Sequence, residues 1–194
     1  MKKTGKNTKG KIVSAAWKLF YEQGYEDTTV EEIIEKSGTS KGSFYHYFEG
    51  KDSLLGTLSY IFDEKYEELK PRITDDMNSV DALIFLNREL FAMIEDSIAI
   101  SLLSGLLSTQ LVTKGEKHLL DRSRVYYKLL RQIVTRGQQK GEITTDLSVG
   151  EVVKMYAMAE RSLMYDWCLC NGEYSLTSYS KNAMPIFLSG IRTK

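Results

Sequence analysis

Apolar residues recur at helical spacing along nearly the whole chain. Near the N-terminus one stripe repeats at i, i+3, i+4, i+7 and i+8, and its members are Ile12, Ala15, Ala16, Leu19 and Phe20. This spacing places them on one face of an amphipathic helix. Because Gly24 is suited to ending such a helix, the pattern predicts a helix over about 8–23.

Two short helices are predicted next, joined by a tight turn at Gly38. In the first, Thr28 or Thr29 is a candidate N-cap with a glutamate three residues later, which is the pattern of a capping box. Ser40 is the candidate N-cap of the second, which is expected to extend to Phe48. Two short helices joined by a tight turn that contains glycine are typical of a helix-turn-helix motif.

The rest of the chain is also predicted to be helical. An apolar stripe from Leu54 to Leu69 predicts one continuous helix of about twenty residues, ending at Pro71. Further helices are predicted near 79–96, 98–111, 115–140, 148–171 and 175–191. Because no alternating strand pattern and no internal repeat is found, the expected fold class is all-α with about nine helices.

Composition limits the possible functions. The chain has 194 residues, of which 42% are hydrophobic, enough for one domain or two small ones. It contains neither a run of about 18 uncharged apolar residues nor a signal-peptide pattern, so we expect a cytoplasmic protein with no membrane partner. His46, His118, Cys168 and Cys170 do not form a metal-ligand motif, and no nucleophile or phosphate-loop motif is present. We therefore expect no metal, no cofactor and no enzymatic activity.

Charge is unevenly distributed although the formal net charge is zero. The first twenty residues contain six lysines and no acidic residue. Residues 52–100 contain four basic residues against eleven acidic ones. The basic N-terminus suits a polyanionic partner.

The second short helix has two different faces. On a helical wheel, Phe44, Tyr47 and Phe48 share one face, which is expected to be buried. The opposite face carries the small, polar and aromatic residues Thr39, Gly42, Ser43, Tyr45 and His46. A glycine in the middle of a helix costs about 1 kcal/mol relative to alanine, but it lets a flat surface approach the backbone. This face is therefore predicted to enter the major groove of DNA, with Lys41 and Lys51 on flanking phosphates.

A continuous segment carries a family resemblance: "KIVSAAWKLFYEQGYEDTTVEEIIEKSGTSKGSFYHYFEGKDSLL" resembles the DNA-binding domain of the tetracycline-repressor (TetR) family of bacterial transcription regulators. The matching elements are "AAxxLFxxxGY", "TTVxxI", "GTSKGSFYHYF" and "KDSLL". The resemblance implies a DNA-binding domain over 8–68, with the helix-turn-helix at about 30–49. Residues 72–194 resemble the family in architecture only, as a helical ligand-binding and dimerisation domain.

The resemblance also implies which residues contact a double-stranded DNA operator. They are Thr28, Thr29, Val30, Thr39, Ser40, Lys41, Gly42, Ser43, Tyr45, His46, Tyr47 and Lys51. Lys41 or Ser43 is expected to reach a base edge, and Tyr45 is expected to make apolar contacts. Glu31 and Glu32 would repel phosphates unless they cap the first short helix, which is the role that we expect.

The resemblance further implies that the larger domain forms a homodimer through the helices near 148–171 and 175–191. A small lipophilic or aromatic effector is expected to release a repressor from a palindromic operator. Aromatic and flexible apolar side chains are candidates for its pocket, namely Phe85, Leu86, Met93, Leu106, Tyr126, Leu130, Tyr156 and Trp167. Glu89, Glu160 and Asp166 are candidates to face a cationic ligand, but each is more simply interpreted as a surface or salt-bridged residue. The alternatives are an activator of the same fold and a helical small-molecule-binding dimer without DNA binding.

Overall fold

The computed structural model describes residues 3–112, 114 and 117–193, and only the backbone of residues 3–7. The chain forms two compact units. The first contains the chain up to Ser59 and then Ser101–Leu119, and the second contains Tyr60–Ile100 and the chain from Leu120 onward. The all-α prediction is confirmed, because the described residues form helices and no strand.

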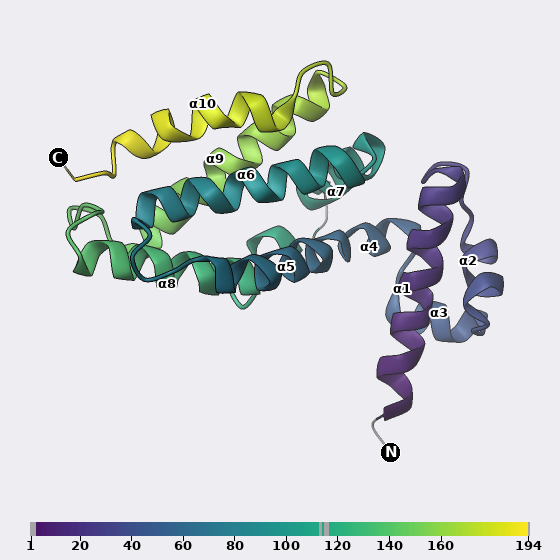
Figure 1. Cartoon of the computed structure of the whole chain (residues 1–194). Coiled ribbons are helices and arrows are strands. Elements are labelled where there is room, and N and C mark those ends of the chain that lie inside the picture. The colour runs from purple at the N-terminus through teal and green to yellow at the C-terminus, as the bar shows by residue number, and fades with distance from the viewer. Residues whose placement is uncertain (1–2, 113, 115–116, 194) are drawn as a thin grey trace. The chain divides into compact units, whose positions relative to one another are not determined.

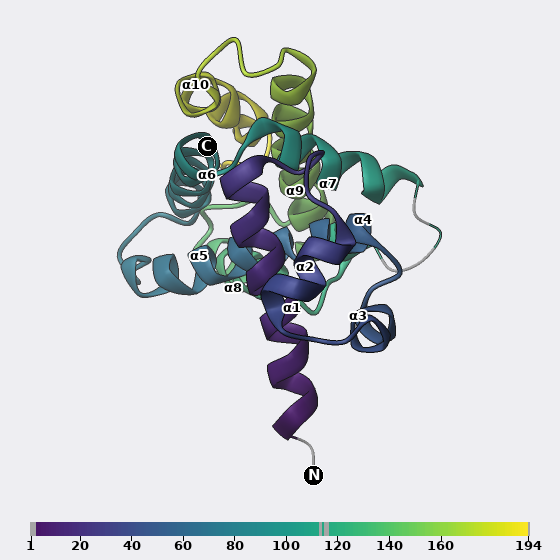
Figure 2. The same cartoon turned by 90° about the vertical axis from the view of Figure 1, so that its right-hand side faces the viewer.

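The first unit contains the predicted helix-turn-helix. Its helices are α1 (Lys3–Gln23), α2 (Val30–Ser37), α3 (Lys41–Tyr47), α4 (Lys51–Leu55) and, from its second residue, α7 (Ile100–Val112). Helices α2 and α3 both pack against α1 (Figures 1 and 2). Part of the lysine-rich N-terminus lies outside the described residues, namely Lys2 and the side chains of Lys3 and Lys6.

The single long helix expected after residue 50 is wrong, because the chain breaks at Gly56. Helix α4 ends at Leu55, and α5 (Leu58–Leu69) begins two residues further on. The Thr57 hydroxyl donates to the Leu54 carbonyl and accepts a hydrogen bond of 2.8 Å from the buried Trp17 Nε1. These bonds stabilise a tight turn within an apolar pattern that continues across it. The break brings the number of α-helices in the described part of the chain to ten.

The second unit is a bundle of long helices. Besides most of α5 it contains α6 (Ser79–Ser97), α8 (Val125–Gln139), α9 (Val149–Leu169) and α10 (Leu176–Ser189). Helix α6 packs against α8 and α10, and α9 packs against the same two helices (Figure 1). No single helix in the described ranges is both long and apolar enough to cross a bilayer, although α6 and α7 pass that test as a bent pair.

Helix α8 begins later than expected. The predicted helix over 115–140 starts instead at Val125, and residues 115 and 116 lie outside the described part. Before it, the Asp121 carboxylate accepts a hydrogen bond of 2.8 Å from the Ser123 N–H, which forms a side-chain turn that competes with the helix. The other four long helices after residue 78 agree with prediction to within two residues.

A buried ion pair connects α5 to the start of α8. Arg124 donates from Nε and Nη2 to the two carboxylate oxygens of Asp63, each at 3.0 Å. The same carboxylate accepts the N–H of Tyr126, at 3.3 Å, in the first turn of α8. Asp63 therefore supplies a negative charge where the α8 dipole is positive.

Candidate nucleic-acid interface

Helix α2 begins with a complete capping box. The Thr29 hydroxyl accepts the Glu32 N–H at 3.2 Å, and the Thr29 N–H donates to the Glu32 carboxylate at 2.7 Å. The bonds from Thr29 hold the pKa of Glu32 below its usual range. Glu32 thus has the expected capping role. Glu31 does not, and its carboxylate lies 3.5 Å from the Lys41 ammonium instead.

The turn between α2 and α3 depends on glycine. Gly38 has φ of 62° and ψ of 32°, in the left-handed region where a side chain is strained. Its N–H donates to the Glu35 carbonyl at 3.0 Å. Ser40 then caps α3 by accepting the Ser43 N–H at 3.1 Å. These local bonds set the start of α3.

Helix α3 presents the two faces expected of it. Phe44 is fully buried and Phe48 nearly so, whereas Tyr45 is 49% exposed and His46 is also exposed. Above Gly42 the surface is open, because an added Cβ would meet only the Ser40 Oγ at 4.0 Å. The exposed face can therefore be approached closely while the phenylalanines hold the helix on the protein.

The two lysines predicted to bind phosphates have different surroundings. Lys41 is exposed, and its ammonium lies 3.5 Å from the Glu31 carboxylate and 6.0 Å from the centre of the Tyr45 ring. Lys51 instead donates to the carbonyls of Tyr25 and Glu26, at 2.6 and 3.2 Å. Lys41 is thus available to a phosphate, whereas Lys51 mainly clamps the loop before α2.

The other predicted contact residues differ in accessibility. Thr29 and Ser40 are exposed, and Val30, Thr39, Ser43 and Tyr47 are half-buried. Thr28 is buried, and its hydroxyl donates to the Gly24 carbonyl at 2.7 Å. The Lys41–Glu31 contact brings the start of α3 next to the first turn of α2. Apart from Thr28, these residues are therefore at least partly accessible to a partner.

The predicted effector residues differ in burial and are divided between the two units. Five of them are buried in the second unit (Leu86, Tyr126, Leu130, Tyr156 and Trp167), Phe85 and Met93 are half-buried, and Leu106 is buried in the first unit. Phe85 stacks under the guanidinium of Arg72, 4.8 Å from its ring centre.

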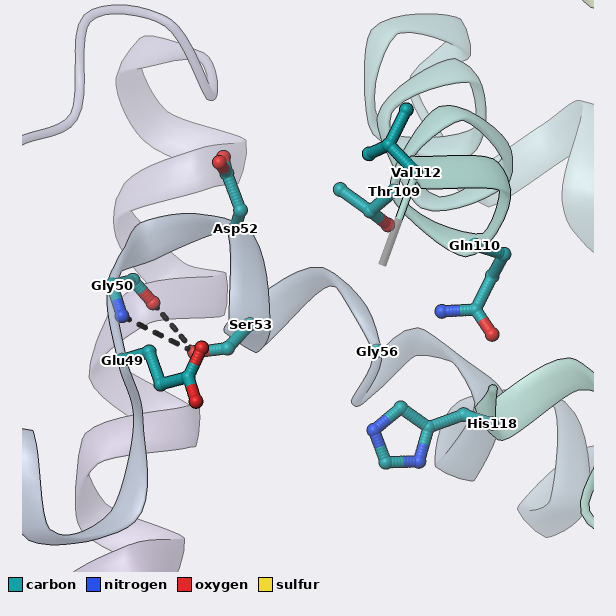
Figure 3. A pocket seen from close by; sticks show the side chains of 9 residues that line it. All are labelled: Glu49, Gly50, Asp52, Ser53, Gly56, Thr109, Gln110, Val112 and His118. Atoms are coloured by element: carbon teal, nitrogen blue, oxygen red, sulfur yellow. Dashed lines mark hydrogen bonds between the residues drawn. The ribbon is translucent and has the colours of Figure 1, made fainter. Parts of the chain in front are cut away.

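One pocket lies within the first unit, between the α4 segment and the end of α7 (Figure 3). Its volume is about 330 Å³, and polar side chains such as Gln110 and His118 line it. Gly56 allows the close approach of His118, since an added Cβ would lie 2.5 Å from its ring. Most of the side chains that line the pocket are polar or charged, whereas a lipophilic effector needs a mainly apolar lining.

A buried polar cluster lies in the second unit. The Glu160 carboxylate, 2% exposed, lies 3.1 Å from Asn87 Nδ2, 2.6 Å from the Tyr126 hydroxyl and 2.9 Å from that of Tyr156. Tyr156 also lies 2.9 Å from the Leu83 carbonyl, and its single proton cannot serve both acceptors. If Glu160 is protonated, it donates a hydrogen bond to the Tyr156 hydroxyl, and Tyr156 donates its own proton to the Leu83 carbonyl. The sequence interpretation of Glu160 as a surface or salt-bridged residue is therefore wrong.

Burial gives Glu160 a testable pH dependence. Desolvation raises the pKa of Glu160 above its usual value, so the folded protein holds this proton more tightly than the unfolded chain does. The free energy of unfolding should therefore fall as pH rises from about 4.3 through the folded-state pKa. Glu160→Gln should lack this decrease in urea unfolding between pH 4 and 8. Identical pH profiles for the wild type and this variant would contradict the assignment, and the exposed Glu64→Gln is the control.

Comparison with known proteins gives consistent results. Residues 12–58 match the family model described as "Bacterial regulatory proteins, tetR family". The fatty acid metabolism regulator protein of Bacillus subtilis is 24% identical over 187 residues, covering 94% of this chain and 95% of that protein. Among solved structures, FadR of B. subtilis in complex with stearoyl-CoA matches with a TM-score of 0.69, 22% identity and coverage of 94% and 98%. Thermus thermophilus FadR, a repressor in complex with lauroyl-CoA, matches with a TM-score of 0.72, 19% identity and 95% coverage of both chains.

Proposed function

Because the chain belongs to the TetR family of bacterial regulatory proteins, we propose that it is a homodimeric repressor that binds a palindromic operator and is released by a small-molecule effector. The broader class, a DNA-binding transcriptional regulator and not an enzyme, agrees with the sequence prediction and with the names of its relatives. Its site of action is the cytoplasm, where bacterial DNA is located.

The two-faced α3 carries the DNA-binding proposal. The buried Phe44 anchors the helix to the protein, and Tyr45 and His46 are exposed on the opposite face. The surface above Gly42, near the start of the helix, is open. A helix placed in the major groove reads base edges with such side chains, while cations position it on phosphates. Lys41 is the cation that we assign to a phosphate, and Ser43 and Tyr45 are assigned to the bases.

Exposed apolar residues on α9 and α10 support the homodimer. On α9, Met155, Met158, Tyr165 and Leu169 follow one face at helical spacing and are each about half exposed or more. On α10, Ile186 is 73% exposed and Phe187 is exposed as well. Large exposed apolar patches mark association sites, and a two-fold axis would bury the same face of both copies.

The proposed effector combines an apolar part with a charged head group. Two structurally similar transcriptional regulators hold stearoyl-CoA and lauroyl-CoA, which have this chemistry. A ligand that favours one arrangement of the second unit would lower DNA affinity if that arrangement moves the two α3 helices away from a spacing of about 34 Å.

A salt-dependent gel shift on duplex selected from a random library tests the proposal. Lys41→Ala and Tyr45→Ala should both weaken binding of the selected duplex, and Lys41→Ala should reduce the slope of log K against log salt by about one. Lys181→Ala, an exposed cation on α10, is the control and should bind as the wild type does. A wild-type protein that selects no duplex at moderate salt would refute the function.

A further inference from the structure

A second pocket in the second unit is surrounded by cations. It lies between α8 and α9 and has a volume of about 240 Å³. Its apolar surface comes from Leu120, Val153 and Ala157, together with the ring of Tyr127. Four basic side chains also line it, namely Arg122, Arg131, Lys154 and Arg161. No acidic residue is among those that form it.

The positions along each helix explain this convergence. On α9 the lining residues Gly150, Lys154, Ala157 and Arg161 recur every three or four positions, which places them on one face. On α8 the lining residue Arg131 follows Tyr127 by one turn. The chain contains no acidic residue between Asp121 and Glu142. The sequence therefore supplies cations to this part of α8 without carboxylates to neutralise them.

Neutral atoms hold the two central arginines. Arg131 Nη2 donates to the Arg122 carbonyl at 3.0 Å, and Arg161 Nη1 lies 3.4 Å from the hydroxyl of the buried Tyr127. Among the ion pairs formed by described residues, none involves any of the four cations. Four like charges around one small cavity repel one another, so a bound anion would relieve an existing electrostatic cost.

We propose that this pocket is the anion subsite of the effector, and that it binds a phosphate-bearing head group with at least two negative charges. This inference rests on the proposed function, since it assigns part of that effector's site. A single carboxylate would leave three of the four positive charges uncompensated, whereas phosphate esters match the fork geometry of several arginines. The cavity has the volume of about eight water molecules, enough for the phosphates of a head group but not for a long apolar chain as well.

Calorimetric titration with three probes tests the subsite. Coenzyme A supplies the phosphates alone, laurate supplies a carboxylate and a chain, and lauroyl-CoA supplies phosphates and a chain. Arg131→Ala/Arg161→Ala should weaken binding of coenzyme A and lauroyl-CoA by about a hundredfold, because each charged hydrogen-bonding partner contributes about tenfold. Laurate affinity should stay unchanged. Lys181→Ala, which removes an exposed cation from α10, should bind all three probes as the wild type does.

Each other outcome overturns the subsite. The first is that wild-type protein binds neither coenzyme A nor lauroyl-CoA at millimolar concentration. The second is that the double variant binds both as tightly as the wild type does. The third is that the double variant loses laurate affinity as much as it loses coenzyme A affinity. A gel shift without any probe separates this inference from the function. The double variant should bind selected duplex as the wild type does, and a loss there would assign the cations to DNA instead. Wild-type protein that binds coenzyme A but no duplex would refute the function and leave the subsite standing.

Discussion

Phe44→Ala is expected to lower the free energy of unfolding of the first unit by about 3–5 kcal/mol and to abolish duplex binding. The ring is fully buried, packs near Phe48 with 5.8 Å between ring centres, and is the main apolar anchor of the seven-residue helix α3. Removing a buried phenylalanine costs its transfer free energy and leaves a cavity. Urea unfolding followed by Trp17 fluorescence, in a Trp167→Phe background, measures the loss, because Trp17 lies in the first unit.

Tyr45→Ala is the matched control, since it removes the neighbouring ring from the exposed face. Its effect on the free energy of unfolding should stay within about 0.5 kcal/mol, as for other surface substitutions, while duplex binding weakens. If Phe44→Ala left stability unchanged, or if Tyr45→Ala destabilised the unit as much, the assignment of the two faces would be wrong.

Asp63→Ala is expected to destabilise the second unit by about 3–5 kcal/mol. It would leave the Arg124 guanidinium, whose side chain is 6% exposed, without its carboxylate, and it would also remove the acceptor for the Tyr126 N–H. Breaking one partner of a buried pair costs far more than losing a surface ion pair. Urea unfolding followed by Trp167 fluorescence, in a Trp17→Phe background, is the measurement, since Trp167 donates its indole N–H within the second unit.

A double-mutant cycle identifies the cause of that loss. Asp63→Leu/Arg124→Leu should be clearly more stable than the sum of the two single changes predicts, because it removes both charges together. The exposed pair of Lys65 and Glu68 provides the comparison, with an expected coupling below about 1 kcal/mol. Additive effects at Asp63 and Arg124 would show that the pair is not coupled.

The helix-turn-helix could be predicted from the sequence because its determinants are local. The αL turn at Gly38, the cap at Ser40 and the capping box at Thr29 each involve residues within four positions of one another. The split between Phe44 and Tyr45 also follows from helical spacing alone. These features need no knowledge of the rest of the fold.

Features set by distant contacts were not predictable in the same way. The turn at Gly56 depends on a bond from Trp17, forty positions earlier than Thr57, while the apolar pattern continues across it. Glu160 is buried because Asn87 and Tyr126, on two other helices, supply its hydrogen-bond partners. Periodicity indicates which side of a helix is buried but does not distinguish a packed core from a cavity. The eight candidate effector residues therefore remain a prediction.

The division of the first unit along the chain also affects its synthesis. Its two segments are separated by residues 60–100, and α7 returns to place Gly105 beside Leu55. The first unit therefore cannot complete its packing when residue 59 leaves the ribosome, because it also needs the chain up to residue 119. At about 5–20 residues per second, that delay is roughly 3–12 s. During this interval the apolar side of α4 is uncovered, so a nascent chain stalled before α7 should be a better chaperone substrate than one released after it.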